Sequence, residues 1–585
     1  MDGNEEDSSS QVIEVYEHEE KCINSCTGDG SVDFYGKPAL KARTGGWKSA
    51  SLLLVNQGLI ALAFSGVEAN LVLFSKLVLK QTNVEAASTF SIWMGTTYFF
   101  SLIGAFLSDS YLGRYLTCII FQLVFIIGLV MLSLSAHFFF LKPHGCEQNG
   151  VPCESDIQNQ FPLFYISIYL IALGSGVSDP ALPTLGADQF DEEEPDEQRS
   201  KTLIYGYFYV ALNLGSLIAE TVLAYIAITG HWVMGFWICT GCACVSFVVL
   251  LSGTLRYRHY KSFGNPFSKF TRVIVSFLRK VKSQIHSIGE GFYGIQRDDD
   301  TRVRRIHHTN GLRFFDRASM VSDDATEMLL GKGQKSYTWN FSSVTQNEGV
   351  KYILRVLPIW FCTIFSSSVF IQMRSLFVEQ GSTMDRTFFK FQIPPASMTT
   401  FDIINTSTFI ILFDVLIIPL YKKLMKKSPK LPSELQNIGI GFAIATVTLI
   451  VAGFIEKERL NFASENGEET SSLSIFWLIP QYMLLGVAEA FVYVAQMNFF
   501  TSQSPDGLES LGMGLYMFSS ALGCYVGNII LTVVNRITSS GQGQHGWVSP
   551  NLNDGHLDMY FFLSSLFIFI DLILYIICAK RYKGI

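Results

Sequence analysis

The sequence predicts an all-α integral membrane protein in which about twelve transmembrane helices form two sets of six. The first observation behind this prediction is composition: of 585 residues, 49% are hydrophobic and only 16% are charged. A soluble chain of this length would form several domains with more charge on their surfaces. The second observation is that the apolar residues come in long blocks; residues 115–141, for example, contain no acidic side chain and no Lys or Arg. A helix of that length spans about 30 Å of hydrocarbon and satisfies its own backbone hydrogen bonds.

The apolar blocks place six helices in each half of the chain. We expect the first six at residues 51–77, 90–110, 115–141, 161–186, 203–228 and 232–255. We expect the second six at residues 351–373, 399–421, 436–455, 474–500, 508–533 and 559–582. The predicted organisation is therefore an N-terminal tail, a first bundle, a polar central loop, a second bundle and a short C-terminus, over residues 1–50, 51–255, 256–350, 351–582 and 583–585.

Positive charge predicts the sidedness of the loops, because cytoplasmic loops carry an excess of Lys and Arg. Basic residues cluster before the first span, in the central loop, in residues 422–430 and at the C-terminus, whereas residues 142–160 hold one Lys. Both termini are therefore predicted to be cytoplasmic, in a multi-pass protein of the plasma membrane rather than the vacuolar membrane. The central loop is expected to be a solvated connector and not a nucleic-acid site. Residues 1–36 are acidic and polar, and we expect a mobile tail there with no cleavable signal peptide.

Most of the eleven cysteines lie in apolar blocks, where they are expected to be small packing residues. The exception is the pair Cys146 and Cys153, which flank a short polar loop and are candidates for a disulfide if that loop faces the outside. The run Cys239, Cys242 and Cys244 lies in an apolar helix and lacks a fourth ligand, so no metal site is expected. Because a nucleophile triad and a phosphate-binding loop are also missing, the sequence predicts neither an enzyme nor a cofactor.

A motif between the second and third spans carries the first functional prediction. Gly104 and Gly113 permit close approach of helices, while Asp109 and Arg114 lie at a cytoplasmic turn. There the two charged residues can form charge-assisted hydrogen bonds that stabilise one of two bundle arrangements. The spacing resembles the motif that links these helices in the major facilitator superfamily, whose two six-helix halves rock about a midplane site. This resemblance implies the major facilitator fold and a gating role for the four residues.

Five further blocks narrow the resemblance to one family. They are GADQFDEEEP (186–195), WMGTTYFFSLIGAFLSDSYLGRY (93–115), LRVLPIW (354–360), IPQYMLLGVAEAFVY (479–493) and FFTSQSPDG (499–507). Together they are similar to the plant nitrate and peptide transporter family, a branch of the proton-dependent oligopeptide transporters. The resemblance implies a secondary transporter, usually driven by protons, for nitrate, short peptides, hormones or secondary metabolites.

The first helix departs from that family's usual pattern. Most members carry Glu-x-x-Glu-Arg there, a cluster that binds and passes the coupling proton. The chain resembles a subgroup that shares the phrase LVNQGLIALAF, in which Gln57, Ile60 and Ala61 occupy those places. None of the three side chains titrates. We therefore expect coupling through other groups, with protons or potassium as the candidate ions, or else a uniporter or exchanger.

Acidic side chains within the predicted spans are the strongest candidates for such groups, because a lone charge near the bilayer centre is costly. Glu489 lies mid-span and matches a family glutamate that lines the central cavity. Asp179 precedes Pro180 and aligns with a position that is usually a Lys paired with that glutamate. If they approach closely, Asp179 and Glu489 can share a proton or bind a cation.

Two more acidic residues are candidates for the substrate or ion site, and each also has a purely structural explanation. Glu68 aligns with a cavity-facing position of the first helix, and Glu220 lies in the fifth. Each is either part of the substrate or ion site or simply paired with a neighbour such as Arg374. Asp402 and Asp414 lie nearer span ends, where we expect water or helix caps to satisfy them.

The seventh span bears on the choice of substrate. Nitrate-binding relatives can use a His there, but the aligned position holds Phe370, so nitrate binding by that route is absent. The resemblance still permits nitrate, because the subgroup with the same first-helix phrase includes nitrate transporters without that His. Arg374, one turn further along, is the one cation near this end that can meet an anion. Its alternative is an interfacial Arg that extends toward the headgroups.

Thr117, three residues after Arg114, is a candidate for regulation. It matches a place that is phosphorylated in a related nitrate transporter, and phosphate there would add negative charge beside Arg114. A kinase on the cytoplasmic side is then the implied partner. The alternative is an ordinary threonine at a helix start.

Three hypotheses follow from these residues. The first is a secondary transporter of nitrate or a small organic solute with atypical proton coupling. The second is a transporter of peptides or cationic metabolites and hormones, held by Asp179, Glu489 and Glu68. The third is a sensor that binds solute without moving it, which the altered first helix makes conceivable.

Overall fold

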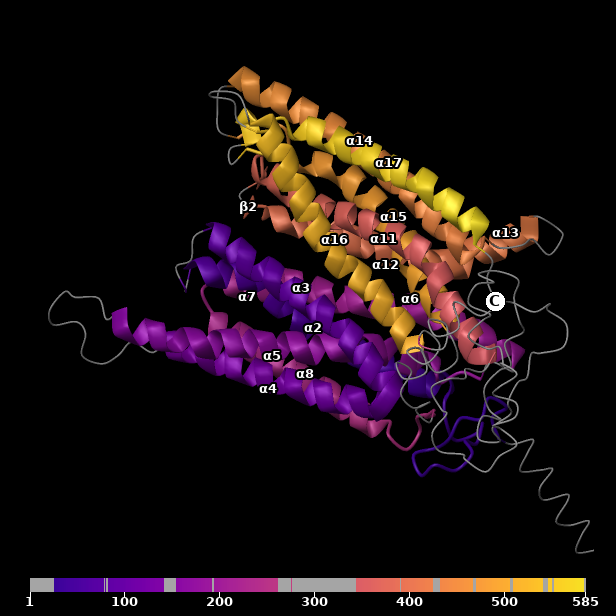
Figure 1. The fold of residues 1–585 in the computed structure, drawn as a ribbon. Helices are drawn as coiled ribbons and strands as arrows, with labels where there is room; N and C mark the ends of the chain where they lie inside the picture. The colour runs from indigo at the N-terminus through magenta and orange to yellow at the C-terminus, as the bar shows by residue number, and fades with distance from the viewer. Residues whose placement is uncertain are drawn as a thin grey trace, which may run out of the picture.

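The computed structural model of the protein describes residues 26–77, 79, 83–140, 154–191, 194–260, 275, 344–389, 391–424, 432–466, 470–504, 509–539, 546–549 and 552–582. Within these residues twelve long helical segments form two groups, which Figure 1 shows as an indigo-to-magenta group below and an orange-to-yellow group above. Eleven of the segments are long and apolar enough to cross a membrane, and α3 is the twelfth. The prediction of an all-α membrane protein is confirmed.

The N-terminal bundle contains six of these segments, and two of them continue through π-turns. They are α2 (Gly46–Leu77), α3 (Asn83–Leu107) with η1 (Ser108–Leu112), α4 (Arg114–Phe140), α5 (Glu154–Ala187), α6 (Pro195–Ile218) with η2 (Ala219–Leu223) and α7 (Ala224–Ile228), and α8 (Trp232–Ser252). α2, α5 and α6 begin five to eight residues before their predicted apolar blocks, because polar residues there continue the helical hydrogen bonding, whereas α4 matches its block within one residue.

The C-terminal bundle has the same number of segments. They are α11 (Val344–Ser382), α12 (Thr399–Leu412) with η6 (Phe413–Ile417) and α13 (Ile418–Leu424), α14 (Glu434–Asn466), α15 (Ile479–Ser502), α16 (Glu509–Thr538) and α17 (Leu557–Arg581). Short elements connect them: the antiparallel strands β1 (Thr387–Phe388) and β2 (Phe391–Gln392), and the 3₁₀ turns η5 (Pro395–Met398), η7 (Ile475–Leu478) and η8 (Leu552–Asp554).

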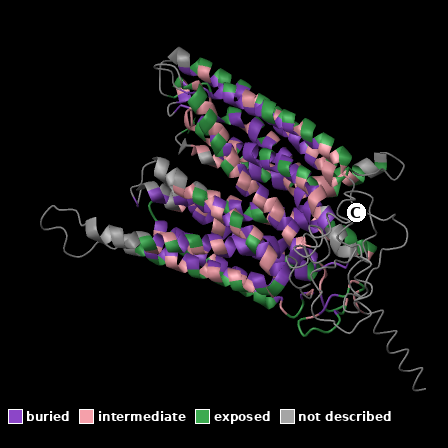
Figure 2. Ribbon diagram, in the orientation of Figure 1, coloured by how far each residue is buried: buried purple, intermediate pink, exposed green. Residues whose placement is uncertain are grey.

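Each bundle has its own buried core, and glycines set how closely its helices approach. Figure 2 shows the buried residues concentrated on the inward helix faces, with exposed residues along the outer faces. A side chain at Gly104 of α3 would lie under 3.0 Å from the backbone of Val177 on α5. Gly174 of α5 likewise lies against the backbone of Phe125 on α4. Small residues at helix crossings are the usual means of tight packing in membranes, where lipid competes with apolar side chains.

Helices of both bundles make the contacts that join them. α16 crosses toward the N-terminal bundle and packs along α3, where Gly514 meets Ala105 and Gly95 meets Tyr525 (Figure 1). α12 packs on α6 and α15 also contacts α6. Any rearrangement of one bundle against the other must therefore pass through the α3–α16 and α6–α12 contacts.

The N-terminal tail is more ordered than the sequence suggested. Val32 and His259 exchange both backbone hydrogen bonds at 2.9 Å, and the Gly45 N–H donates to the Arg256 carbonyl at 2.8 Å. The Tyr260 hydroxyl donates to Asp29 at 2.5 Å. The expectation of a mobile tail is therefore wrong for residues 26–36, because main-chain pairing with residues 256–260 holds them; residues 1–25 lie outside the described structure, as do Cys146 and Cys153.

The glycine contacts generate a stability prediction. Gly104→Ala places a methyl group against the Val177 backbone, which cannot yield as a side chain would, so we expect a loss of about 1–3 kcal/mol from overpacking. The matched control is Gly241→Ala in α8, where a methyl group meets nothing within 4 Å.

Thermal unfolding of the two purified variants, followed by intrinsic fluorescence, measures the difference. Gly104→Ala should unfold at a lower temperature than the unchanged chain, whereas Gly241→Ala should match it. Equal unfolding temperatures for both variants would contradict the packing account.

Candidate functional site

Arg114 is the centre of an ion-pair cluster that joins the two bundles. Its guanidinium contacts Asp188 and Glu509, and its Nε lies 3.3 Å from Asp109 and 3.1 Å from the Ser510 hydroxyl. Asp109, Asp188 and Arg114 belong to the N-terminal bundle, whereas Glu509 and Ser510 begin α16 in the other. We call these five residues the Arg114 cluster.

Two further hydrogen bonds cross the same seam. The Leu511 N–H at the start of α16 donates to Asp109 Oδ2 at 3.0 Å, so the carboxylate also meets the positive end of that helix. The Thr184 and Ser510 hydroxyls lie 3.0 Å apart. The side chains of Asp109 and Arg114 are 1% and 10% exposed, so these charge-assisted bonds are largely shielded from water.

Local backbone geometry places these side chains. Asp109 lies on the π-turn η1, and Gly113 has a φ of 78°, a conformation that a residue with a side chain rarely adopts. That turn allows α4 to begin immediately at Arg114. Thr117 follows one turn later; it is fully buried and its hydroxyl donates to the Gly113 carbonyl at 2.8 Å. In this arrangement a kinase could reach Thr117 only if the start of α4 opened.

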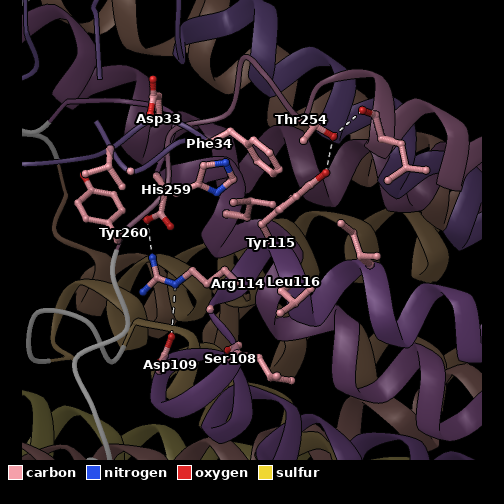
Figure 3. Close-up of a pocket in the computed structure, with 18 residues that line it drawn as sticks. Asp33, Phe34, Ser108, Asp109, Arg114, Tyr115, Leu116, Thr254, His259 and Tyr260 are labelled. Atoms are coloured by element: carbon pink, nitrogen blue, oxygen red, sulfur yellow. Dashed lines mark hydrogen bonds and ion pairs between the residues drawn. The ribbon is translucent and has the colours of Figure 1, made fainter. Parts of the chain in front are cut away.

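A cavity of about 660 Å³ lies beside the Arg114 cluster (Figure 3). Its walls include Phe34 from the N-terminal tail and His259 and Tyr260 from the segment after α8, facing Arg114 and Tyr115. The tail and the segment after α8 thus cover the end of the N-terminal bundle at which the cluster lies.

Arg374 is the centre of a second cluster, in the interior between the bundles. Its Nε and Nη2 donate to the two carboxylate oxygens of Glu489 at 2.9 and 2.6 Å. Asp402 Oδ2 lies 3.6 Å from the same Nη2. The Tyr209 hydroxyl, from the N-terminal bundle, donates to Glu489 Oε2 at 3.4 Å. The carboxylates are 1% and 2% exposed, whereas the Arg374 side chain as a whole is 47% exposed.

Aromatic side chains line this Arg374 cluster. Tyr493, one turn after Glu489 on α15, contacts the rings of both Tyr209 and Phe370. Phe370 is fully buried one turn before Arg374, so it packs behind the ion pair and has no polar atom to offer a solute. The Tyr482 hydroxyl on the same face of α15 is buried, has no hydrogen-bond partner among the residues that the structure describes, and interacts electrostatically with Asp402, Glu220 and Arg374.

Two acids of the N-terminal bundle face the same cluster. Glu220 on η2 accepts a 2.8 Å hydrogen bond from the Thr399 hydroxyl at the start of α12. Glu68 on α2 receives no hydrogen bond from any residue that the structure describes, but interacts electrostatically with Glu220 and Arg374. One guanidinium therefore faces four carboxylates, two from each bundle.

The structure gives Asp179 and Glu489 different partners. Arg374 binds Glu489, whereas Asp179 accepts a 3.3 Å hydrogen bond from Ser175 on its own helix. The expected pairing between these two acids is not formed in this arrangement. The alternative that Arg374 extends to the headgroups does not match this arrangement, because the buried Glu489 carboxylate holds two of its three donor nitrogens, Nε and Nη2.

Sequence reasoning missed several contributors. Asp402 was expected to be satisfied by water or a cap, but it is buried beside Arg374. Tyr209 and Glu509 were not singled out at all. The Glu509 carboxylate, near the start of a helix, offered a weak signal; Tyr209 lies in an apolar block and offered none.

Among the described residues there is no group of His, Cys, Asp and Glu side chains able to hold a metal ion. Outside the spans, the Lys41–Glu194 ion pair at 2.5 Å raises the pKa of Lys41 and lowers the pKa of Glu194 through their mutual hydrogen bond. Unlike the two clusters, this pair is substantially exposed.

Comparison with known proteins agrees with this geometry. The POT family model PTR2 matches residues 115–548. The chain is 46% identical to the protein NRT1/PTR FAMILY 7.3 of Arabidopsis thaliana, covering 96% of this chain and 92% of that relative. It is 47% identical to NRT1/PTR FAMILY 7.2 of the same plant, covering 96% of each.

Solved structures show the same fold at low sequence identity. An auto inhibited POT family peptide transporter aligns with a TM-score of 0.62 at 20% identity, over 92% of this chain and 98% of that one. The POT family transporter PepTSo aligns with a TM-score of 0.60 at 20% identity, over 92% and 99%. The two bundles therefore have the major facilitator arrangement.

The fold and the comparisons together identify the class of protein and its family. The two six-helix bundles, with ion pairs across their seam, are those of a membrane transporter rather than an enzyme. The chain belongs to the POT family, in its branch of plant NRT1/PTR relatives.

The Arg114 cluster generates a conformational prediction. Glu509→Gln removes the charge that α16 presents to Arg114 while Asp109 and Asp188 remain, so we expect the bundle contact to lose about 1–2 kcal/mol. The distance between spin labels at positions 111 and 580, one on each bundle at this end, reports the separation. Because the chain has eleven cysteines, the labels are attached through unnatural amino acids.

The variant should show a larger population with a long distance between the labels. Glu194→Gln, which breaks the exposed pair with Lys41, is the matched control and should leave the distance distribution unchanged. A Glu509→Gln distribution identical to that of the unchanged chain would show that the Arg114 cluster does not hold the bundles together.

Proposed function

We propose that this POT family transporter moves nitrate or a small organic solute by alternating access and couples it to protons through the Arg374 cluster. The observation that carries the proposal is the two-point hydrogen bond between Arg374 and Glu489, made by a side chain that as a whole is still partly exposed. The Glu-x-x-Glu-Arg route of the first helix is not available for this coupling.

The balance of charge in the cluster requires a proton or another cation. Arg374 carries one positive charge, and Glu489, Asp402, Glu68 and Glu220 carry four negative charges when all are ionised. Uncompensated charge away from water costs several kcal/mol per ion, so the fully ionised cluster is disfavoured. Protonation of one or more carboxylates, or binding of a cation such as potassium, relieves this cost.

A proton on Glu489 changes what Arg374 can bind. The neutral carboxyl group accepts hydrogen bonds from the guanidinium less strongly than the carboxylate does. Arg374 then has donor capacity free for an anion, and its exposed face allows that anion to approach. Proton and anion bind together with little change in net charge, and loss of the proton to the other side restores the ion pair and expels the anion. This sequence gives symport of an anion with a proton.

The side chains at the usual Glu-x-x-Glu-Arg positions of the first helix favour a proton route through other residues. Gln57, Ile60 and Ala61 are all buried, and none of them ionises. The Oε1 atom of Gln57 has no hydrogen-bond partner among the described residues. The N-terminal bundle therefore contributes its titratable groups to the cluster through Glu68 and Glu220 instead.

Alternating access requires contacts that form and break between the bundles. The Arg114 cluster supplies such contacts at one end, with Gly104 and Gly113 allowing the close approach that they need. Thr117 is retained as a candidate phosphorylation site, because phosphate there would oppose the acids of the cluster once the start of α4 opened.

A second candidate is a transporter of peptides or cationic solutes. The observation in its favour is Glu68, a carboxylate that faces the cluster, receives no hydrogen bond within the described part of the chain and can receive a substrate ammonium group. Asp179 lies deeper in the N-terminal bundle and would serve only after rearrangement. The third candidate, a sensor without transport, has in its favour only the altered first helix.

The proposal predicts the behaviour of Glu489→Gln. Uptake of labelled nitrate into oocytes should rise at acidic pH for the unchanged chain, because acid favours the protonated cluster. The Gln variant cannot release a proton, so its uptake should fall about tenfold or more and lose its dependence on pH. Measurements at two pH values and two potassium concentrations separate proton coupling from potassium coupling.

Glu194→Gln is the matched control, because it removes an acid that pairs with Lys41 at an exposed position outside the spans, away from the Arg374 cluster. Its uptake should resemble that of the unchanged chain. Acid-stimulated nitrate uptake that persists in Glu489→Gln would contradict the coupling route. Absence of nitrate flux in every condition, with the protein present at the cell surface, would contradict nitrate as the solute.

A further inference from the structure

The hydrogen bond between Thr399 and Glu220 joins the bundles at a point that the Arg114 cluster does not reach. Thr399 begins α12, and Glu220 lies in the last third of the α6–η2–α7 segment. By the predicted orientation both residues lie in the outer half of the membrane, whereas the Arg114 cluster lies at the cytoplasmic end. The Thr399 hydroxyl donates to Glu220 Oε2 at 2.8 Å.

Glu220 occupies an unusual piece of helix. The Ala224 N–H donates to the Ala219 carbonyl five residues earlier, which is the hydrogen bond of a π-turn. A π-turn widens the helix by one residue and is frequent at functional sites. Ala219 and Leu223 are buried on either side of Glu220, and η5 packs against this turn from the other bundle. The π-turn is thus packed against η5, which ends at Met398 immediately before Thr399.

The same helix face connects Thr399 to the Arg374 cluster. Asp402 follows Thr399 by three residues and Thr406 follows by seven, so all three lie on one face of α12. Asp402 is 3.6 Å from Arg374, and the Thr406 hydroxyl donates to the Gly486 carbonyl on α15 at 3.1 Å. Because Asp402 and Arg374 belong to the same bundle as Thr399, movement of Thr399 away from Glu220 would also carry both of them away from Glu220 and Glu68.

Charged groups from every neighbouring helix face Glu220. Glu68 approaches from α2, Arg374 from α11, Asp402 from α12 and the Tyr482 hydroxyl from α15. Among the described residues, Thr399 is the partner that donates a hydrogen bond to Glu220. Without that donor, the carboxylate would face two other acids with only Arg374 to offset them, and Arg374 is already bonded to Glu489.

We infer that Thr399 is a positioning residue and that its hydrogen bond to Glu220 is a latch that holds the outer halves of the two bundles together. The inference rests on the alternating access proposed above and adds a specific contact to it. The latch must break for the outer end to open, as the Arg114 cluster must break for the inner end to open. A charged carboxylate accepts the hydroxyl more strongly than a neutral one, so neutralising Glu220 weakens the latch.

Labelling of a buried neighbour tests the latch without any substrate. Met398 is 1% exposed and immediately precedes Thr399. In a Met398→Cys chain, the rate of reaction with a maleimide, measured on purified full-length protein in nanodiscs, reports how often this seam opens. The same chain with Met398 intact gives the background from the eleven native cysteines.

Thr399→Val, which keeps the size but removes the donor, should raise the labelling rate at position 398 about tenfold, the magnitude expected for loss of a hydrogen bond to a charged acceptor. Glu220→Gln should give a smaller rise, and Thr399→Ser should restore the original rate. Thr221→Val is the matched control on the same π-turn, because its hydroxyl bonds only to carbonyls of its own helix, and it should have no effect.

A rate in Thr399→Val equal to that of the unchanged chain, with unfolding temperatures also equal, would overturn the latch. So would a rise of equal size in Thr221→Val. Because the readout needs no solute, the two proposals can fail separately. Normal latch behaviour without nitrate flux would reject only the proposed substrate, and proton-coupled nitrate flux with unchanged labelling would reject only the latch.

Discussion

The ion pair between Arg374 and Glu489 determines how charge can be arranged between the two bundles. A guanidinium this deep in a membrane protein needs a carboxylate, and a carboxylate needs a cation or a proton. Because Glu489 satisfies Arg374 with two hydrogen bonds, Asp402, Glu68 and Glu220 remain as excess acids around a single positive charge. Proton or cation binding, substrate charge and bundle position are therefore linked in the proposed mechanism: any change in one alters the electrostatic cost of the others.

Contacts between the bundles connect the charges around Arg374 to both ends of the molecule. The Arg114 cluster joins the start of α4 to the start of α16, and the Thr399–Glu220 bond joins α12 to the π-turn of the fifth segment. Tyr209 contributes a third contact, directly onto Glu489. Glycines such as Gly104 make these contacts possible, since they let rigid helices approach within backbone distance. Each bundle can then move as a unit while only a few polar bonds at the seam exchange.

Most of the fold could be predicted from the sequence, because a membrane-spanning helix is recognisable in the sequence as a long apolar block. The turn containing Asp109, Gly113 and Arg114 could also be located, because its residues are adjacent in sequence. The partners of Arg374 could not, since Glu489 is more than a hundred residues away and the pairing depends on how α11 and α15 pack. The sequence places Asp402 near a span end, and its position beside Arg374 likewise depends on how the helices pack. The backbone pairing of Val32 with His259 could not be predicted either, because every residue has the same main-chain donor and acceptor and the residue types therefore do not reveal it.

Proton uptake on solute binding is the most direct measurement of the central claim. Nitrate is added to the purified transporter in a weakly buffered solution containing a pH-sensitive dye, while nitrate binding is followed in parallel. The account predicts that the protein takes up protons as nitrate binds, because an anion at Arg374 requires neutralisation of a carboxylate in the cluster. Nitrate binding at Arg374, shown by its loss in Arg374→Gln, without any proton uptake would contradict it.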